Sequence, residues 1–270
     1  MEMSIKRFVL NIRLFFEGAL LSYMGLFHWL RPVTYLASKV MAPLMQMLFF
    51  VFIGTYATSG QDASFYVIGN ALIFTASSGI FGVTMSIGGE RWTGTLPYLF
   101  GTPSNRMALF LGRAFMHIFD GMLGVWIGLG WGVVLFHLDL SQSNPLALLV
   151  IILITTFSTA GLGLLMGCLS LITRNVMFVN NTVYFLLLVF SGANLDLTTL
   201  PRWMQTISNI LPLTRGVTAT RFVIAGGNPA DISAMMLEEI LIGVILVFMG
   251  YALFRWFEFE AKKRGTLEVF

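Results

Sequence analysis

Long apolar stretches separated by short polar connections dominate the chain. Six of them are long enough, or nearly so, to cross a hydrocarbon layer of about 30 Å as helices that rise about 1.5 Å per residue. They cover residues 33–56, 65–88, 107–136, 146–171, 176–193 and 236–257. The fifth is the shortest, and we expect it to cross incompletely. Because the stretches are continuously apolar and do not alternate, they predict an all-α polytopic membrane protein with six transmembrane helices, and not a β-barrel.

Residues 5–31 have a different pattern, with polar and apolar side chains on opposite halves of one helix. Arg13 and Glu17 fall in the middle, where charges are costly in lipid. The pattern therefore favours an amphipathic helix lying in the membrane interface over a seventh span covering residues 8–30. It divides the chain into an N-terminal interfacial helix, residues 1–31, and a transmembrane domain, residues 32–270. No cleavable signal peptide is expected.

Composition narrows the possible classes of protein further. Hydrophobic residues make up 57% and charged residues 11% of the 270 positions, against about 25% charged in soluble proteins. These fractions exclude a soluble domain, a disordered chain and a nucleic-acid binder. The single cysteine, Cys168, excludes a disulfide within the chain and a cysteine zinc cluster.

Lysines and arginines give the orientation, because they concentrate on the cytoplasmic side of membrane proteins. They cluster near the N-terminus, after the second stretch, between the fourth and fifth, and in the tail. The connections at 57–64 and 137–145 have none. Both termini are therefore expected in the cytoplasm. The exception is segment 194–235, which this topology places outside although it carries Arg202, Arg215 and Arg221.

Catalytic signatures are missing from the sequence. A Walker A loop needs a Gly-Lys pair, and none of Lys6, Lys39, Lys262 and Lys263 follows a glycine. The three histidines have no metal-ligand spacing, so no metal site is predicted, and no nucleophile elbow is present. The chain is therefore not expected to be an enzyme or to hydrolyse ATP itself.

The connection from Gly88 to Pro103 is the most informative loop, since it is polar and bounded by helix breakers. Leu96, Leu99 and Phe100 can form the apolar face of a short helix, which suits docking into a groove of another protein. The alternative is a plain interfacial turn.

Two motifs carry a family resemblance. The pattern Glu90-Arg91-x-x-Gly94-Thr95-Leu96-x-x-Leu99-x-x-x-Pro103 resembles the cytoplasmic loop of ABC-2 type transporter permeases. The second motif is similar to a region of the same family, especially of its drug-export and nodulation-factor-export branch. It comprises Ser191-Gly192-Ala193, Leu200-Pro201, Leu211-Pro212-Leu213-Thr214 and Arg221.

The resemblance implies a half-transporter that pairs as a homodimer or heterodimer in a prokaryotic cell (inner or plasma) membrane. It implies a separate cytoplasmic ABC ATPase subunit that binds ATP and Mg, with no cofactor in this chain. The loop would be the coupling helix seated in that ATPase, and the N-terminal helix would also contact it. Segment 194–235 would form outer re-entrant helices, from which the arginines could snorkel. The coupling residues would be Glu90, Arg91, Thr93, Gly94, Thr95, Leu96, Leu99 and Pro103.

Polar and small residues inside the apolar stretches are candidates for the pathway and for packing. The polar ones face protein or a cavity, so they either bond helices together or line a pathway. These pathway candidates are Gln46, Asn70, Ser77, Thr84, Asn180 and Asn181. Asn70, Ser77 and Thr84 follow one another at heptad spacing, so we expect them on roughly one face of the second span. Glycines at helical spacing let helices approach closely. These packing candidates are Gly124, Gly128, Gly132, Gly163 and Gly167.

Arg113, His117 and Asp120 fall at i, i+4 and i+7 of the third stretch, so they form a possible polar network on one face. An intramembrane carboxylate is a functional candidate by default. The alternative is a purely structural ion pair or hydrogen-bonded network. Glu238 and Glu239 open the sixth stretch, and we expect both in the outer interface.

Together these features predict the permease subunit of an ABC exporter, which moves an amphiphilic substrate out of the cytoplasm or the inner leaflet. A secondary transporter or channel that needs no ATPase is the alternative, and an intramembrane enzyme is a third. The sequence does not identify the cargo.

Overall fold

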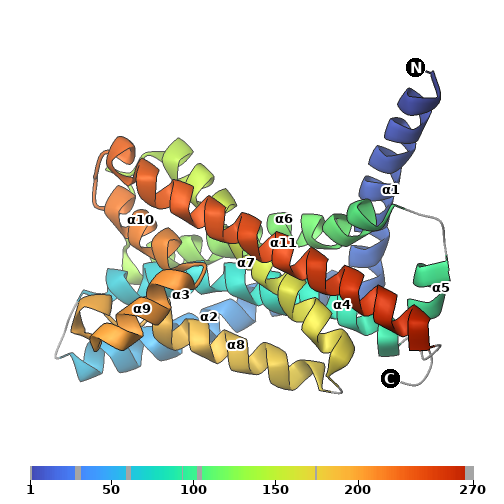
Figure 1. Cartoon of the computed structure of the whole chain (residues 1–270). Helices are drawn as coiled ribbons and strands as arrows, with labels where there is room; N and C mark the ends of the chain where they lie inside the picture. Colours follow the sequence, from blue (N-terminus) through green and yellow to red (C-terminus); the bar gives the residue numbers. More distant parts are fainter. Residues whose placement is uncertain are drawn as a thin grey trace.

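The computed structural model describes residues 2–27, 32–58, 62–92, 94–101, 105–173 and 175–264, which contain helices and no β-strand. Long helices run roughly side by side and form an elongated bundle (Figure 1). The long helices of the bundle are α2 (Pro32–Ala57), α3 (Ala63–Ala76), α4 (Val83–Trp92), α6 (Arg106–Phe136), α7 (Pro145–Ile172), α8 (Val176–Phe190) and α11 (Ser233–Arg264).

The predicted spans correspond to these helices. Five of them are long and apolar enough to cross a membrane. The fifth predicted span forms α8, which has 15 residues and is therefore about 22 Å long. This length is below the hydrocarbon thickness of about 30 Å, so incomplete crossing stays the expectation for this segment. The chain is thus an all-α, multi-pass membrane protein.

The second predicted span is not a uniform α-helix. A π-helical segment, η1 (Ser77–Gly82), joins α3 to α4 without a break. Its hydrogen bonds reach five residues along the chain, and such segments occur often at functional sites. This irregularity lies next to the candidate site described below.

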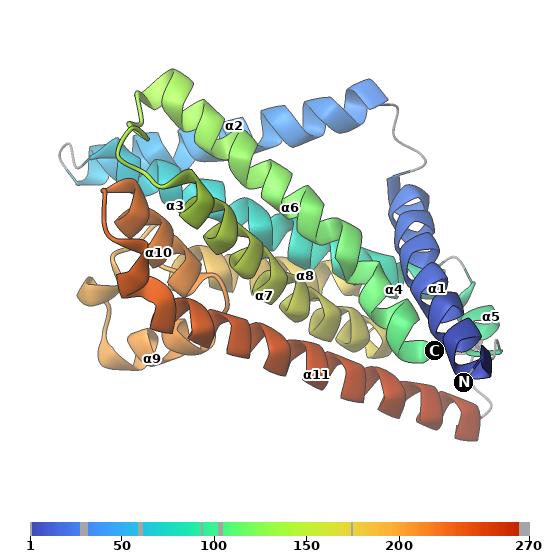
Figure 2. The ribbon, with the colours of Figure 1, turned by 90° about the horizontal axis from the view of Figure 1, so that it is seen from above.

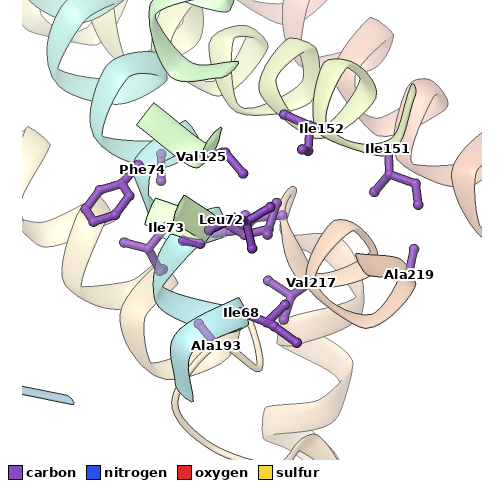
Figure 3. Close-up of a cluster of buried hydrophobic side chains, with 14 of the residues drawn as sticks. Ile68, Leu72, Ile73, Phe74, Val125, Ile151, Ile152, Ala193, Val217 and Ala219 are labelled. Atoms are coloured by element: carbon purple, nitrogen blue, oxygen red, sulfur yellow. The ribbon is translucent and has the colours of Figure 1, made fainter. Parts of the chain in front are cut away.

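The core lies where α3, α6, α7 and α10 (Thr214–Ile224) meet. Figure 3 shows side chains from these elements meeting in one apolar cluster. Leu72, Val125, Ile152 and Val217 are at most 1% exposed in it. Burial of this kind contributes about 25 cal/mol for each Å² of apolar surface when the alternative is water. Within lipid, close packing takes over that role.

The N-terminal helix, α1 (Glu2–Phe27), runs across the end of the bundle instead of along it (Figures 1 and 2). It packs on α6, where the rings of Phe15 and Phe115 lie 5.1 Å apart in an edge-to-face arrangement. Ala19 is 1% exposed at the same contact. The predicted helix extended to residue 31, and residues 28–31 lie outside the described part of the chain.

Segment 194–235 folds into short helical pieces at the opposite end from α1 (Figure 1). They are η2 (Leu197–Thr199), α9 (Arg202–Ile210), α10 and η3 (Pro229–Ile232). Pro201 precedes α9 and Pro229 begins η3, as expected for a residue that cannot donate a backbone hydrogen bond inside a helix.

Candidate functional site

Asp120 of α6 lies at the centre of a buried cluster of polar side chains, and its side chain is only 1% exposed. It forms an ion pair with Lys39. Its oxygens also accept hydrogen bonds from Tyr23 at 3.0 Å, Tyr35 at 2.7 Å and Ser78 at 2.7 Å. Hydrogen bonds of this number and kind stabilise a charged carboxylate away from water. We call Asp120 and its four partners the Asp120 cluster.

The cluster joins four elements. Tyr23 comes from α1, Tyr35 and Lys39 come from the first turns of α2, and Ser78 comes from the π segment. The hydroxyls of Tyr23 and Tyr35 also share a hydrogen bond. Burial and the negative Asp120 raise the pKa of Tyr23 to about 12, so this tyrosine stays a hydrogen-bond donor at neutral pH. A single carboxylate therefore ties the transverse helix α1 to the core of the bundle.

A cavity of about 280 Å³ adjoins the Asp120 cluster. Its walls come from α2, α3, the π segment and α6. The residues that line it are Ser38, Lys39, Ala42, Pro43, Gln46, Phe74, Ser77, Ser78, Phe81, Gly82, Asp120 and Gly124.

The stripe predicted on α6 does not form one network, because Arg113 and His117 have different partners from Asp120. The ring of His117 is fully buried and lies 2.9 Å from the hydroxyl of Ser86. Arg113 donates to the backbone carbonyl of Ser86. These contacts hold α6 against α4, whereas Asp120 points to α1, α2 and the π segment.

The six pathway candidates also have different surroundings. Gln46 and Ser77 line the cavity. Asn70 instead donates to the side chain of Asn194 at 2.8 Å, and Thr84 donates to the carbonyl of Gly163 at 3.2 Å, so both connect packed segments. Asn180 is buried and Asn181 is exposed on α8.

The heptad argument for a single polar face on the second span was wrong, because the π segment lies between Asn70 and Thr84. A π turn contains more residues than an α turn. Positions seven residues apart across it therefore do not keep one direction.

The five packing glycines lie at close helix contacts. A Cβ atom at Gly128 would lie 3.0 Å from the Cα atom of Ala71, and one at Gly132 would lie 2.5 Å from Val67. A Cβ at Gly163 would collide with the carbonyl oxygen of Gly79. A Cβ atom at Gly124 would contact Phe74, and one at Gly167 would contact Ile87. These glycines allow α6 to approach α3, and α7 to approach the π segment and α4.

The described parts of the loop 90–103, the end of α4 and helix α5, lie at the end of the bundle that holds α1 (Figure 1). Helix α4 ends at Trp92, Gly94 has φ +69°, and α5 (Leu96–Gly101) follows. A left-handed φ favours glycine, so Gly94 allows the chain to turn between the two helices. Thr95 and Tyr98 are exposed. Thr93 and Pro103, and the side chains of Glu90, Arg91, Leu96 and Leu99, lie outside what the structure describes.

Arg221 contradicts the expectation that the arginines of segment 194–235 snorkel outward. Its guanidinium donates to the carbonyls of Phe65 at 2.8 Å, Gly192 at 2.8 Å and Ala193 at 3.0 Å, and lies 3.6 Å from the centre of the Phe65 ring. Burial lowers the pKa of Arg221 to about 10, which leaves it charged at neutral pH. Three backbone acceptors in one place attract the side chain inward. We call this group the Arg221 anchor.

Glu239, which we expected in the outer interface, is buried inside the protein. Its carboxylate accepts from the hydroxyl of Ser158 and, at 2.7 Å, from the backbone N–H of Leu213. Leu213 has φ +83°, which is unusual for a residue with a side chain. Glu238 is exposed and pairs with Arg215 at 2.8 Å.

Lys39, Tyr23 and Tyr35 were not predicted as partners of Asp120. Lys39 had a detectable signal, because it is the only charged residue in the stretch 33–56. Tyr23 and Tyr35 had none, because tyrosines are common near membrane interfaces. Among the described residues, no three His, Cys, Asp or Glu side chains gather in a way that could hold a metal ion.

Comparison with known proteins identifies a family. Residues 17–225 match the model of the family described as ABC-2 type transporter. A search of curated protein sequences gave no match to the chain. The matched region runs from α1 to the end of α10 and includes the Asp120 cluster, the loop 90–103 and the Arg221 anchor.

Proposed function

The chain belongs to the ABC-2 type transporter family, and we propose that it is the permease subunit of an exporter driven by a separate cytoplasmic ATPase. In this proposal it moves an amphiphilic substrate out of the cytoplasm or the inner leaflet of a prokaryotic cell membrane. The loop motifs favour the drug-export and nodulation-factor-export branch. The observation that carries the proposal is the family match over residues 17–225 in a chain without a Gly-Lys pair.

The arrangement of the loop supports a coupling role. The chain turns at Gly94, and α5 lies at the same end of the bundle as the start of α1 and the end of α11 (Figure 1). An ATPase bound at this end would contact the loop and α1 together. Movement of α1 would reach the membrane core through Tyr23 and Asp120, which are hydrogen-bonded. Both termini would then face the cytoplasm.

A second permease copy would complete the pathway. Helices α2 and α8 expose large apolar side chains, including Phe49, Phe52, Phe178 and Phe185. In a monomer these faces contact lipid. In the proposed homodimer or heterodimer they meet a partner permease.

The test is ATPase activity in liposomes that contain this chain and its cognate ATPase. The double variant Glu90→Ala/Arg91→Ala should lower the permease-stimulated ATPase rate by about tenfold, since it alters the proposed contact with the ATPase. The matched control Arg215→Ala/Glu238→Ala removes one arginine and one glutamate at the far end of the bundle and should stay within about twofold of the native rate. Substantial ATP hydrolysis by the purified chain alone would reject the proposal. Equal stimulation by both double variants would reject Glu90 and Arg91 as the contact, and the absence of any stimulation by the native chain would favour a secondary transporter or channel.

A further inference from the structure

Two backbone irregularities converge on the cavity beside the Asp120 cluster. Pro43 lies inside α2 and lines the cavity, and it cannot donate the backbone hydrogen bond of a normal helical residue. On the other wall, Ser77, Ser78, Phe81 and Gly82 belong to the π segment. Irregular backbone at membrane depth is tolerated where it lines a cavity. Both features therefore mark this space as more than a packing defect.

Three polar side chains of the lining, Lys39, Gln46 and Ser77, can each donate a hydrogen bond to a ligand. Gln46 uses its Oε1 to accept from the hydroxyl of Tyr184 at 2.7 Å. Its Nε2 is buried and has no hydrogen-bond partner among the described residues. An unpaired buried donor is costly, and a ligand that accepts its hydrogen bond removes that cost. Ser77 adds a hydroxyl to the same lining.

Lys39 supplies a positive charge to the same space. Its side chain is 20% exposed, whereas that of Asp120 is 1% exposed. Asp120 also accepts from three hydroxyls, of Tyr23, Tyr35 and Ser78. These hydroxyls stay with the carboxylate if Lys39 turns toward a ligand. Lys39 is thus the partner of Asp120 that can also bind a ligand.

These observations select the charge of the ligand. A cationic headgroup would have to reach a carboxylate that four donors already cover. An uncharged headgroup would accept only a weaker hydrogen bond from the ammonium than an anion does. A carboxylate or phosphate oxygen would accept from Lys39, from Nε2 of Gln46 and from the hydroxyl of Ser77, and charged hydrogen bonds of this kind are among the strongest.

The cavity also has room for an amphiphile to enter from the side. Its volume of about 280 Å³ is far above the roughly 10–15 Å³ that a single water molecule requires. Ser38 and Ala42 line it and are exposed, so it reaches the surface of α2. Met41 and Met45 lie on the exposed surface of that helix, at 47% and 53% exposure. An alkyl chain could lie along them while the headgroup occupies the cavity.

We propose that the cavity between α2, the π segment and α6 binds the anionic headgroup, carboxylate or phosphate, of an amphiphile, with Lys39 as its charged contact. The assignment names a substrate class and rests on the proposed export function. Gln46 and Ser77 complete the headgroup contacts, and Phe74 and Phe81 form the apolar walls.

The experiment measures binding of three probes that share one alkyl chain. Octyl phosphate, octyl glucoside and octyltrimethylammonium are titrated calorimetrically, below their micellar concentrations, into the full-length protein in phosphatidylcholine nanodiscs. Octyl phosphate should bind about tenfold tighter than the other two. Similar affinities for all three, or tightest binding of the cationic probe, would overturn the proposal.

Variants locate the binding. Lys39→Met should weaken octyl phosphate binding by about tenfold, and Lys39→Arg should keep most of it. Lys262→Met, a matched control at the exposed end of α11, should change nothing. Gln46→Met leaves the Lys39–Asp120 pair intact and should weaken binding by about threefold, so it serves as the test if Lys39→Met does not fold. Native affinity in both Lys39→Met and Gln46→Met would overturn the assignment.

Two further arms separate the alternatives. Inorganic phosphate should compete at least about a hundredfold more weakly than octyl phosphate, because it lacks the apolar chain. Equal competition would mean a free-anion site and would overturn the amphiphile assignment. Because binding is measured without the ATPase, a chain that binds octyl phosphate but never stimulates an ATPase would reject the exporter function and keep the site. The reverse result would reject the site alone.

Discussion

The Asp120 cluster and the Arg221 anchor each surround a buried charged side chain among packed helices, but they bind it in different ways. Asp120 is bound by side chains from α1, α2 and the π segment. Arg221 is bound by three backbone carbonyls, two of which belong to the turn at 191–193. Side chains can change partner by rotating, whereas backbone carbonyls move only with their helix. The comparison indicates an adjustable junction at one end of the bundle and a fixed one at the other.

The largest effect is expected at the fixed junction. Arg221→Met leaves three backbone carbonyls without their donor and should lower the free energy of unfolding by about 3 kcal/mol or more. Thermal unfolding in detergent, followed by tryptophan fluorescence, measures the loss. Arg221→Lys should recover part of it. Arg202→Met, an exposed arginine nearby, should cost less than about 0.5 kcal/mol. Equal losses for Arg221→Met and Arg202→Met would show that the anchor contributes nothing.

The two partners of the buried ion pair should not be equivalent. Asp120→Asn leaves Lys39 without a carboxylate and should cost about 2–3 kcal/mol. Lys39→Met leaves Asp120 with three hydroxyl donors and should cost about 1 kcal/mol. The double variant should be more stable than Asp120→Asn alone. The same melting assay compares all three, and a greater loss for Lys39→Met than for Asp120→Asn would contradict the view that Lys39 is the partner of Asp120 that can also bind a ligand.

Removal of one hydroxyl should loosen α1 selectively. Tyr23→Phe deletes the hydrogen bond from α1 to Asp120 and should cost about 1 kcal/mol. Hydrogen–deuterium exchange should rise in α1 and stay unchanged in α10. Tyr56→Phe, at a tyrosine that is 90% exposed, is the matched control. Equal exchange in Tyr23→Phe and the native protein would mean that α1 is held by its apolar contacts with α6, such as Phe15 on Phe115, and not by this hydrogen bond.

The smallest effect is expected for Asp196, whose negative charge lies close enough to Arg221 to raise the pKa of that arginine. Hydrogen bonds from the backbone N–H and the hydroxyl of Thr198 hold the pKa of Asp196 below its ordinary value. Because the side chain is exposed and screened, Asp196→Asn should cost less than about 0.5 kcal/mol. Its folded pKa is depressed, so this contribution is complete above the unfolded pKa of about 3.9 and disappears as pH falls through the folded value. Melting temperatures of the variant and the native protein should therefore differ equally at pH 7 and pH 6 and converge below about pH 4. A large loss at neutral pH would show that Arg221 depends on a carboxylate after all.

The sequence predicted the spans well because each apolar stretch must become a helix in lipid, where unpaired backbone groups are too costly. Helix starts also had local signals, since the side chains of Asn105, Asn144 and Asn175 accept from backbone N–H groups at the first turns of α6, α7 and α8. These signals depend only on neighbouring residues.

The partners of buried charges could not be predicted in the same way. Arg221 meets Phe65, which lies 156 positions earlier, and nothing local to Arg221 identifies that carbonyl. The π segment had no recognised sequence signal either, so Ser77 and Thr84 were placed on one face. Lys39 did have a signal in the sequence, although it was not used, because a lone charge in an apolar stretch requires a partner.

The π segment also fixes how the two halves of the second span are turned about their common axis. If all the residues of Ser77–Gly82 wound instead as a plain α-helix, α4 would be rotated by about 100° relative to α3, because the π turn takes up one more residue than an α turn. Thr84 would then leave the carbonyl of Gly163, and Ser86 would leave His117. The end of α4 at Trp92 would face another side of the bundle. The extra residue of the π segment thus determines the direction in which the protein presents the loop that follows α4.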